Sequence, residues 1–297
     1  MEKIQVLMST YNGEKYIEEQ INSIINQKGV NVDLLIRDDG SNDSTIEKLN
    51  KYENKINFYI GENIKPAKSF MELIKNAGDY NFFAFADQDD IWKEQKLNRA
   101  INKIKEIDNG QPIIYFSDKE LIDEKQNTIY HKKINYNLSF KSAMIRNIAT
   151  GCTIVINKKL MEIIKQYEPT YLEMHDAWIY RVCLAIGGSV IYDDCELIKY
   201  RQHNNNVIGA KESLKKQIIR RINSFKNCKH VREKTAQEML KAYANIITKE
   251  NLKVIKALAN YRKSIRCKLL LLFDYNLKTE KIKDDIIFKV ALLINRV

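Results

Sequence analysis

The chain has 297 residues, of which 44% are hydrophobic and 29% charged, so it is long and apolar enough to bury a sizeable core. Ten glycines and three prolines are too few for a collagen-like, linker-rich or low-complexity protein. The five cysteines are odd in number, widely spaced and without a CxxC pair, which argues against a disulfide framework or a zinc site and predicts a reducing compartment.

Residues 1–210 alternate short apolar strands with amphipathic helices, a pattern typical of an α/β fold on a largely parallel sheet. We predict strands at residues 4–9, 32–37, 56–60, 82–86, 113–117, 148–156 and 190–200. We predict helices at residues 14–27, 45–52, 69–77, 92–107 and 176–186.

Residues 211–297 carry the positive charge of the chain, whose formal net charge is +11. They hold 22 Lys+Arg and 8 Asp+Glu, a net of +14, whereas residues 1–210 have a net of −3. This region has almost no Gly or Pro, and its apolar spacing predicts helices at residues 215–225, 237–265 and 286–297. We therefore place a domain boundary near residue 210.

The basic helices have four interpretations, one of which is a lid on the acceptor side of the site. Helices of this kind lie on anionic membrane surfaces. Equally, they fit a helical bundle that packs on the first domain with a solvated lysine face, and they fit a homodimer interface. No stretch reaches the ~18–20 apolar residues of a spanning helix, and the first residues lack a secretory signal pattern. We expect a cytoplasmic protein, peripheral at the inner face of the cell membrane.

Polar and acidic residues follow three of the predicted strands. The segments are STYNG at residues 9–13, DDGSNDS at residues 38–44 and DQDD at residues 87–90. Ligands of open α/β sheets bind at the carboxyl ends of strands, so these segments predict one shared site. Neither GxGxxG nor GxxxxGK[ST] follows a strand, which argues against the phosphate-binding loops of dehydrogenases and P-loop enzymes.

The DQDD run indicates a divalent cation. Mg²⁺ binds through one or two carboxylates together with substrate phosphate oxygens. Acidic residues before a helix also complement its dipole, but three like charges packed together cost stability without a counterion. The run therefore predicts an ion that joins the protein to a phosphorylated ligand.

The segments STYNGEKYIEEQINSI, LLIRDDGSNDST and FFAFADQDDIW together resemble glycosyltransferase family 2 enzymes with the GT-A fold. The segments DQDDIW, HDAW and YRQHNNNVIG are most similar to the bacterial rhamnosyltransferase-like branch, which assembles surface polysaccharides. The resemblance covers residues 3–209 and implies a mixed, mainly parallel sheet flanked by helices. The basic α-helical extension lies outside it.

The resemblance implies a nucleotide site. Thr10 and Tyr11 match the motif that cradles the base, and Asp39 matches the residue that hydrogen-bonds the pyrimidine ring. A carboxylate accepts a hydrogen bond from the ring N3–H of uracil or thymine, and an aromatic side chain offers a stacking face.

The resemblance also implies a metal site and a catalytic base. Asp87, Asp89 and Asp90 match the metal and ribose motif, with Asp89 the expected direct ligand of Mn²⁺ or Mg²⁺ and Asp87 beside it. Asp176 matches the general base, although a capping carboxylate at a helix start is its ordinary structural role. His203 is a candidate third metal ligand or diphosphate contact.

We therefore expect a metal-dependent, inverting glycosyltransferase. The branch favours dTDP-L-rhamnose as donor, with a UDP-sugar as the competitor, and a growing glycan, commonly lipid-linked, as acceptor. The alternative is a catalytically inactive nucleotide-sugar-binding or glycan-binding subunit, against which the intact Asp87, Asp89 and Asp176 argue. Nucleic acid is not an expected partner, because the basic region lacks a known motif and the first domain is net acidic.

Overall fold

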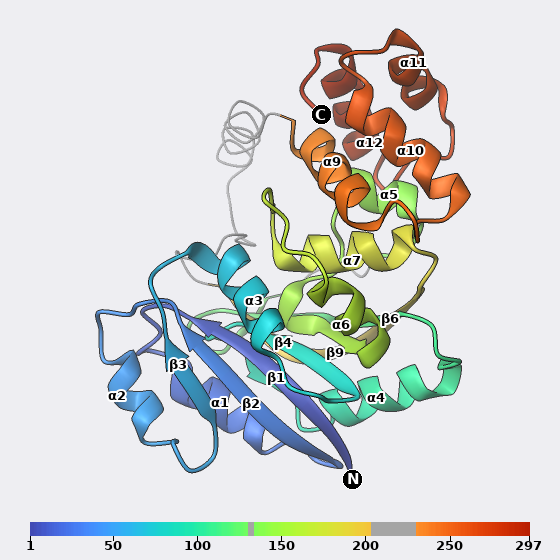
Figure 1. The fold of residues 1–297 in the computed structure, drawn as a ribbon. Coiled ribbons are helices and arrows are strands. Elements are labelled where there is room, and N and C mark those ends of the chain that lie inside the picture. Colours follow the sequence, from blue (N-terminus) through green and yellow to red (C-terminus); the bar gives the residue numbers. More distant parts are fainter. Residues whose placement is uncertain (130–133, 203–229) are drawn as a thin grey trace.

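The computed structural model describes residues 1–129, 134–202 and 230–297, and a nine-stranded sheet forms its centre (Figure 1). The strands run in the order β3–β2–β1–β4–β8–β6–β9–β5, with β7 paired to β6 outside this path. The neighbours β3, β2, β1 and β4 are parallel, whereas β8 is antiparallel to both β4 and β6. The strands are β1 (Glu2–Thr10), β2 (Val30–Asp38), β3 (Asn57–Ile60), β4 (Phe82–Ala86), β5 (Ile91–Trp92), β6 (Ile113–Ile122), β7 (Thr128–Ile129), β8 (Ile154–Asn157) and β9 (Ser189–Arg201).

Helices cover both faces of the sheet, and the strands have an apolar side chain for each face. On β1, Ile4, Val6 and Met8 belong to the core under α1, α2 and α4, whereas Leu7 belongs to the core under α3, α6 and α7. The helices are α1 (Ile17–Ile25), α2 (Thr45–Asn50), α3 (Lys65–Asn76), α4 (Lys96–Ile107), α5 (Phe140–Ile145), α6 (Lys158–Lys165), α7 (His175–Ala185), α9 (Val231–Tyr243), α10 (Lys249–Asn260), α11 (Ile265–Phe273) and α12 (Ile282–Leu293). The predicted mixed, mainly parallel sheet flanked by helices is confirmed.

The prediction of one helix over residues 92–107 is wrong at its start. Trp92 lies in β5, which pairs antiparallel with β9, and α4 begins only at Lys96. The contacts of Trp92 explain the difference. The Trp92 backbone N–H donates to the Ser23 hydroxyl, and the centre of its buried indole ring lies 3.5 Å from the Lys96 ammonium. Tertiary pairing of two residues with high strand propensity thus overrides the helical pattern.

The prediction of one long strand over residues 148–156 is also wrong. A 3₁₀ turn, Gly151–Thr153, precedes β8. The Thr153 backbone N–H and hydroxyl both donate to the Thr150 carbonyl, at 2.9 and 2.7 Å, which closes the turn. The turn brings Gly151 to the start of α7, where the candidate catalytic carboxylate lies.

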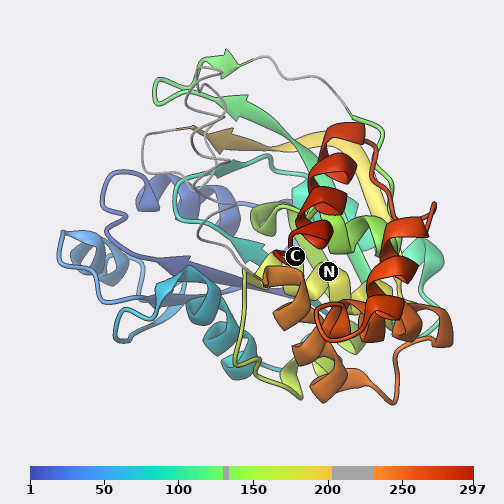
Figure 2. The same ribbon diagram turned by 90° about the horizontal axis from the view of Figure 1, so that it is seen from above.

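The C-terminal helices α9–α12 share one hydrophobic core with α3, α5, α6 and α7. They form a layer beyond α7, and in Figure 2 the orange and red helices lie at one end of the molecule and the blue N-terminal elements at the other. The predicted helix at 237–265 is divided, because Thr248 caps a new helix at Lys249. The predicted helix at 215–225 and the boundary near residue 210 lie outside the described residues. Among the described helices, none has the length and apolar character needed to span a bilayer.

Candidate active site

A glutamine in the acidic run joins the ends of β1 and β4. The Thr10 hydroxyl donates to Gln88 Oε1 at 2.6 Å, and the Tyr11 backbone N–H donates to the same oxygen at 2.8 Å. Gln88 Nε2 donates in return to the Tyr11 carbonyl at 3.2 Å. The Tyr11 ring is 43% exposed, so its face is open to a ligand. The sequence motifs do not predict this role of Gln88. Its position between Asp87 and Asp89 is the feature of the sequence that could have indicated it.

The loop after β1 is interlocked with the turn after β2. The Asn12 backbone N–H donates to the Ser41 hydroxyl at 2.8 Å, and the Asn42 N–H donates to Asn12 Oδ1 at 3.0 Å. A side chain at Gly13 would collide with Gln88 Oε1 and Thr10 Oγ1, because a Cβ built there lies 2.7 and 2.8 Å from them. Glycine at this position therefore leaves room for the Gln88 side chain, which follows β4, to approach the loop after β1.

Asp39 is buried and holds an internal ion pair. Its Oδ1 accepts from the Arg37 guanidinium and from the Ile64 N–H, and its Oδ2 accepts from the Lys65 N–H at 3.0 Å. A carboxylate has about four acceptor positions, so these bonds leave one position, on Oδ2. Asp39 thus organises the loop before α3 through a buried carboxylate.

The acidic run gathers with a cysteine that motif spacing does not reveal. The carboxylate oxygens of Asp87 and Asp90 and the Cys152 sulfur all lie within 4.8 Å of one another. Asp89 is outside this group, and its backbone carbonyl accepts from Arg201 Nε at 2.9 Å. Cys152 is 62 residues from Asp90, and only the packing of the 3₁₀ turn against β4 brings it to the site.

The cluster carries more negative charge than its surroundings balance. Burial, with repulsion from Asp89 and Asp176, raises the pKa of Asp87 to about 7. Burial, with repulsion from Asp89 and Asp87, raises the pKa of Asp90 well above its usual range, and its Oδ2 has no hydrogen-bond partner. Crowded carboxylate oxygens with an unpartnered buried atom fit a hard divalent cation. The structure thus brings Asp87 and Asp90 into a group whose chemistry fits a divalent cation, whereas Asp89, the expected direct ligand, lies outside this group.

A lysine of β6 faces the acidic cluster from the other side. The Lys119 ammonium donates to the Thr150 hydroxyl at 2.6 Å, lies 4.5 Å from the centre of the Tyr200 ring and acts to lower the pKa of Asp87. Sequence reasoning missed this residue because no motif surrounds it. His203, the predicted third metal ligand, lies outside the described residues.

Asp176 lies in the first turn of α7 and receives two backbone hydrogen bonds. Its Oδ2 accepts from the Gly151 N–H at 3.2 Å, and its Oδ1 accepts from the Ala177 N–H at 2.5 Å. Burial nevertheless raises the pKa of Asp176 to about 6. It also lies within electrostatic reach of Asp87, so the fold brings the predicted base to the acidic cluster.

The residue before Asp176, His175, packs in the core. The His175 ring stacks on Phe70 with centroids 3.8 Å apart, and burial lowers the pKa of His175 to about 3. A neutral imidazole therefore fills the space beneath Gly151, where an added Cβ would lie 2.9 Å from His175 Nε2. His175 and Gly151 fix the start of α7 and with it the Asp176 carboxylate.

Helix α9 holds the loop that leads into α7. Glu238 accepts from the Thr170 N–H at 2.7 Å, the Thr170 hydroxyl at 2.9 Å and the Tyr167 hydroxyl at 3.0 Å. At the other end of the loop, Glu173 pairs with Arg181 of α7 and with Arg232 of α9. Although burial opposes it, attraction to Arg232 and Arg181 lowers the pKa of Glu173 to about 2.

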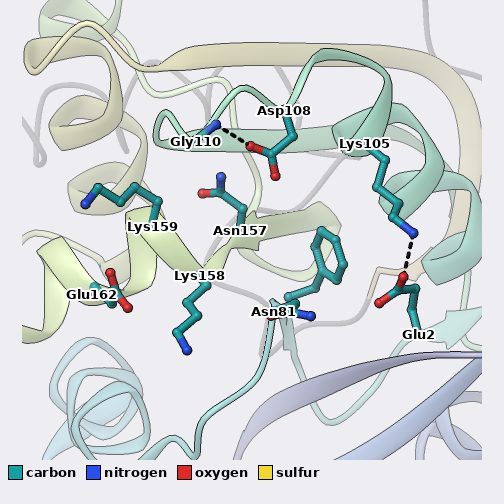
Figure 3. Close-up of a pocket in the computed structure, with 10 residues that line it drawn as sticks. Glu2, Asn81, Lys105, Asp108, Gly110, Asn157, Lys158, Lys159 and Glu162 are labelled. Carbon is teal, nitrogen blue, oxygen red and sulfur yellow. Dashed lines mark hydrogen bonds and ion pairs between the residues drawn. The ribbon is translucent and has the colours of Figure 1, made fainter.

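A separate pocket of about 390 Å³ lies at the amino ends of β1 and β4 (Figure 3). Glu2 and Phe82, at the starts of β1 and β4, are part of its lining. Its lysines Lys105 and Lys158 pair with Glu2 and Asp79. The motif residues follow the other ends of these strands, so this pocket is distinct from the candidate active site.

The chain belongs to glycosyltransferase family 2: the model of that family, described as glycosyl transferase family 2, matches residues 5–164. The match confirms the resemblance drawn from the motifs, and the chain is a glycosyltransferase.

Curated relatives extend the match beyond residue 164. The dTDP-rhamnosyl transferase RfbG of Shigella flexneri is 31% identical over 235 residues, which cover 72% of this chain and 77% of the relative. The UDP-Glc:alpha-D-GlcNAc-diphosphoundecaprenol beta-1,3-glucosyltransferase WfgD of Escherichia coli is 27% identical, covering 72% and 83%. A glycosyltransferase of Rickettsia typhi, RT0329, is 28% identical, and the match spans 64% of its length.

Solved structures show that the fold is GT-A. The TarS fragment 1–349 of S. aureus in complex with UDP matches with a TM-score of 0.57 and 19% identity, covering 96% of this chain and 78% of that one. The mannosyltransferase PcManGT of Pyrobaculum calidifontis in complex with GDP-Man and Mn²⁺ matches with a TM-score of 0.55 and 15% identity, covering 98% and 85%.

Proposed function

We propose that the chain transfers one sugar from a nucleotide-activated donor to a glycan acceptor, with inversion at the anomeric carbon. The observation that carries the proposal is the placement of Asp176 across the acidic cluster from the nucleotide loop that Gln88 ties to Thr10. A single displacement needs one base, one leaving-group site and one donor site. The residues proposed for the donor and the leaving group follow β1, β2 and β4, and the proposed base, Asp176 in the first turn of α7, lies within electrostatic reach of Asp87.

In the proposed transfer reaction, side chains of this chain accept the proton and stabilise the leaving group. The acceptor hydroxyl oxygen bonds to the anomeric carbon as its proton passes to Asp176. The bond from that carbon to the diphosphate oxygen breaks, and the nucleoside diphosphate leaves with the electron pair. Burial raises the pKa of Asp176 to about 6, which makes its carboxylate a stronger base than that of an ordinary aspartate. Because this pKa is still below neutral, the carboxylate is mostly ionised at neutral pH. Lys119 adds a positive charge on the diphosphate side of the cluster.

We propose that Asp87, Asp89 and Asp90 hold Mn²⁺ or Mg²⁺. When bound, such an ion stabilises the negative charge of the departing diphosphate. The crowding of carboxylates around the unpartnered Asp90 Oδ2 supports this, as does the presence of Mn²⁺ beside GDP-Man in the mannosyltransferase complex. Thr10, Tyr11 and the free acceptor position of Asp39 would take the pyrimidine base.

We propose dTDP-L-rhamnose as the favoured donor and a UDP-sugar as the competitor. The 31% identity to a dTDP-rhamnosyl transferase supports the first, and the glucosyltransferase relative supports the second. The name of that second relative gives a diphosphoundecaprenol-linked acceptor, which supports a lipid-linked glycan acceptor here and a place at the inner face of the cell membrane.

Turnover of a donor panel tests the proposal. We expect one nucleotide-sugar to be hydrolysed or transferred only with Mn²⁺ or Mg²⁺. We expect Asp89→Ala and Asp176→Asn to lose turnover, with nucleotide binding retained in Asp176→Asn. The matched control is Asp79→Asn, an 83% exposed side chain on the far edge of the sheet, which should keep full activity. Nucleotide binding without turnover of any donor would favour the alternative, an inactive binding subunit.

A further inference from the structure

The two last helices both expose large apolar side chains. On α12, Ile282, Ile286, Ile287, Val290 and Leu293 are 40–77% exposed, while Phe288, Ala291 and Leu292 on the other side are buried in the core. The exposed positions recur at intervals of three and four residues, so they form one stripe along the helix.

Helix α11 extends the same apolar surface, since it packs against α12. Its exposed residues are Ile265, Leu269, Leu270 and Phe273, with Phe273 79% exposed, and Tyr275 follows at 78%. Large apolar side chains gathered in one place on a globular domain mark an interaction surface, whereas single ones do not. We name the exposed apolar residues of 265–294 the apolar face.

The exposed charges of the segment that carries the apolar face have one sign. Between residues 262 and 297, all of which the structure describes, every exposed charged side chain is Lys or Arg: Arg262, Lys263, Arg266, Lys278 and Lys283. The acids of this segment are turned to the protein instead. Asp274 pairs with Lys141, Glu280 and Asp284 pair with Arg146, and Asp285 accepts from Thr279. The segment thus carries exposed hydrocarbon together with these five cations, which we name the cationic rim; Arg262 is paired with Glu233, and exposed Glu250 of α10 contacts Lys141 beside Asp274.

We propose that the apolar face inserts into the headgroup region of an anionic lipid bilayer. Isoleucine, leucine and phenylalanine side chains gain free energy on leaving water, and the cationic rim is attracted to acidic headgroups. A symmetric pair of chains joined through this face would instead bring the two cationic rims together. Lipid is therefore the occupant that the charges favour over a second copy. The inference deepens the proposed membrane location and does not depend on which sugar is transferred.

The face is rigidly connected to the candidate base. Lys141 of α5 pairs with Asp274, and Arg146, which directly follows α5, pairs with Asp284 of α12. Arg181 Nε of α7 donates to the Ala143 carbonyl of α5 at 3.0 Å. Asp176 lies at the start of α7. Insertion of the face would therefore fix the orientation of the active site relative to a lipid-linked acceptor.

Vesicle sedimentation of the full chain tests the proposal. We expect the parent to bind vesicles of phosphatidylcholine with phosphatidylglycerol far better than phosphatidylcholine alone. The double variant Ile282→Ser/Ile286→Ser should bind at least about tenfold more weakly, because burying one isoleucine contributes on the order of 1.5–3 kcal/mol and tenfold corresponds to about 1.4 kcal/mol. The matched control, Ile107→Ser/Ile246→Ser, removes two exposed isoleucines elsewhere and should bind as the parent does.

A second pair of variants isolates the charge. Lys278→Glu/Lys283→Glu should lose binding to the anionic vesicles, whereas Lys51→Glu/Lys75→Glu, on exposed lysines of the first domain, should reduce it little. Circular dichroism melting of every variant checks that each is folded.

Three results would overturn the proposal. They are no binding of the parent to anionic vesicles, equal losses in variants and controls, or a parent dimer that Ile282→Ser/Ile286→Ser converts to monomer with vesicle binding unchanged. The last would make a second copy the occupant. Donor turnover with a water-soluble acceptor is measured beside binding, so a chain that binds vesicles but transfers no sugar would refute only the proposed function.

Discussion

The Thr10 hydroxyl donates a 2.6 Å hydrogen bond to Gln88 Oε1, and this contact couples the loop proposed to hold the base to the loop proposed to hold the metal. The same oxygen accepts from the Tyr11 N–H. A single amide side chain therefore sets the distance between the two halves of the donor site.

Replacing Gln88 by leucine should separate the two loops. A typical hydrogen bond contributes about 0.5–1.5 kcal/mol, and Gln88 makes three, so we expect nucleotide affinity to fall by at least about tenfold. Isothermal titration with UDP and dTDP would measure this. The control Gln111→Leu removes an amide bonded to Ser189 and should leave affinity unchanged. Equal affinities of Gln88→Leu and the parent would show that Gln88 has no such role.

The pH profile should report Asp176. Its carboxylate is the proposed base and burial raises its pKa to about 6, so kcat should rise with pH through about 6 and then level off. A profile that stays flat down to pH 4 would contradict the assignment.

Stability should change with pH in the opposite sense. The folded state holds the Asp176 proton to higher pH than the unfolded chain, for which 3.8 is the ordinary value, so this residue lowers the free energy of unfolding as pH rises from about 4 to about 6. The difference corresponds to an upper value of about 3 kcal/mol. Asp176→Asn should therefore be inactive and yet more stable than the parent at pH 8, by urea unfolding. A less stable variant would show that the carboxylate mainly caps α7.

A divalent cation should stabilise the fold through the acidic cluster. Binding to the folded state alone at 100 times the Kd contributes about 2.7 kcal/mol, which raises Tm by roughly 5 °C for a chain of this size. Scanning calorimetry with and without Mn²⁺ would measure the shift, and Asp87→Asn/Asp90→Asn should abolish it. Asp79→Asn should keep it. No shift in the parent would argue against a metal at this cluster.

Most strands and the motifs at their ends could be predicted from the sequence, because an apolar run such as Phe82–Ala86 is local and the polar segments follow directly. The partners of the site could not. Cys152 and Lys119 reach the acidic cluster only through the sheet, and Glu238 reaches the loop before Asp176 from a helix more than 60 residues later. Long-range packing leaves no periodic pattern in the chain. The helical pattern misplaces Trp92 for the same reason, since its strand exists only beside β9.

The C-terminal region should support catalysis through Glu238. Its carboxylate accepts three hydrogen bonds from Tyr167 and Thr170, on the loop before Asp176, so Glu238→Ala should loosen that loop. We expect kcat to fall about tenfold, a loss of about 1.4 kcal/mol, with the Kd for nucleotide unchanged. The control is Glu250→Ala, whose side chain is 79% exposed on α10. A rise in nucleotide Kd, with kcat unchanged, would place the effect on the donor site instead.

The narrow space between Gly151 and the His175 ring allows a test of whether the position of α7 controls catalysis. A methyl group at residue 151 would lie 2.9 Å from His175 Nε2 and 3.6 Å from the Asp176 Cβ, so Gly151→Ala should displace the start of α7 and lower kcat by more than about tenfold. His175→Ala removes the imidazole and makes room for the methyl group. Gly151→Ala should therefore cost less activity in a His175→Ala background than in the parent. A double-mutant cycle on kcat would measure this coupling. Strictly additive losses would show that the His175 ring does not transmit the position of Gly151 to Asp176.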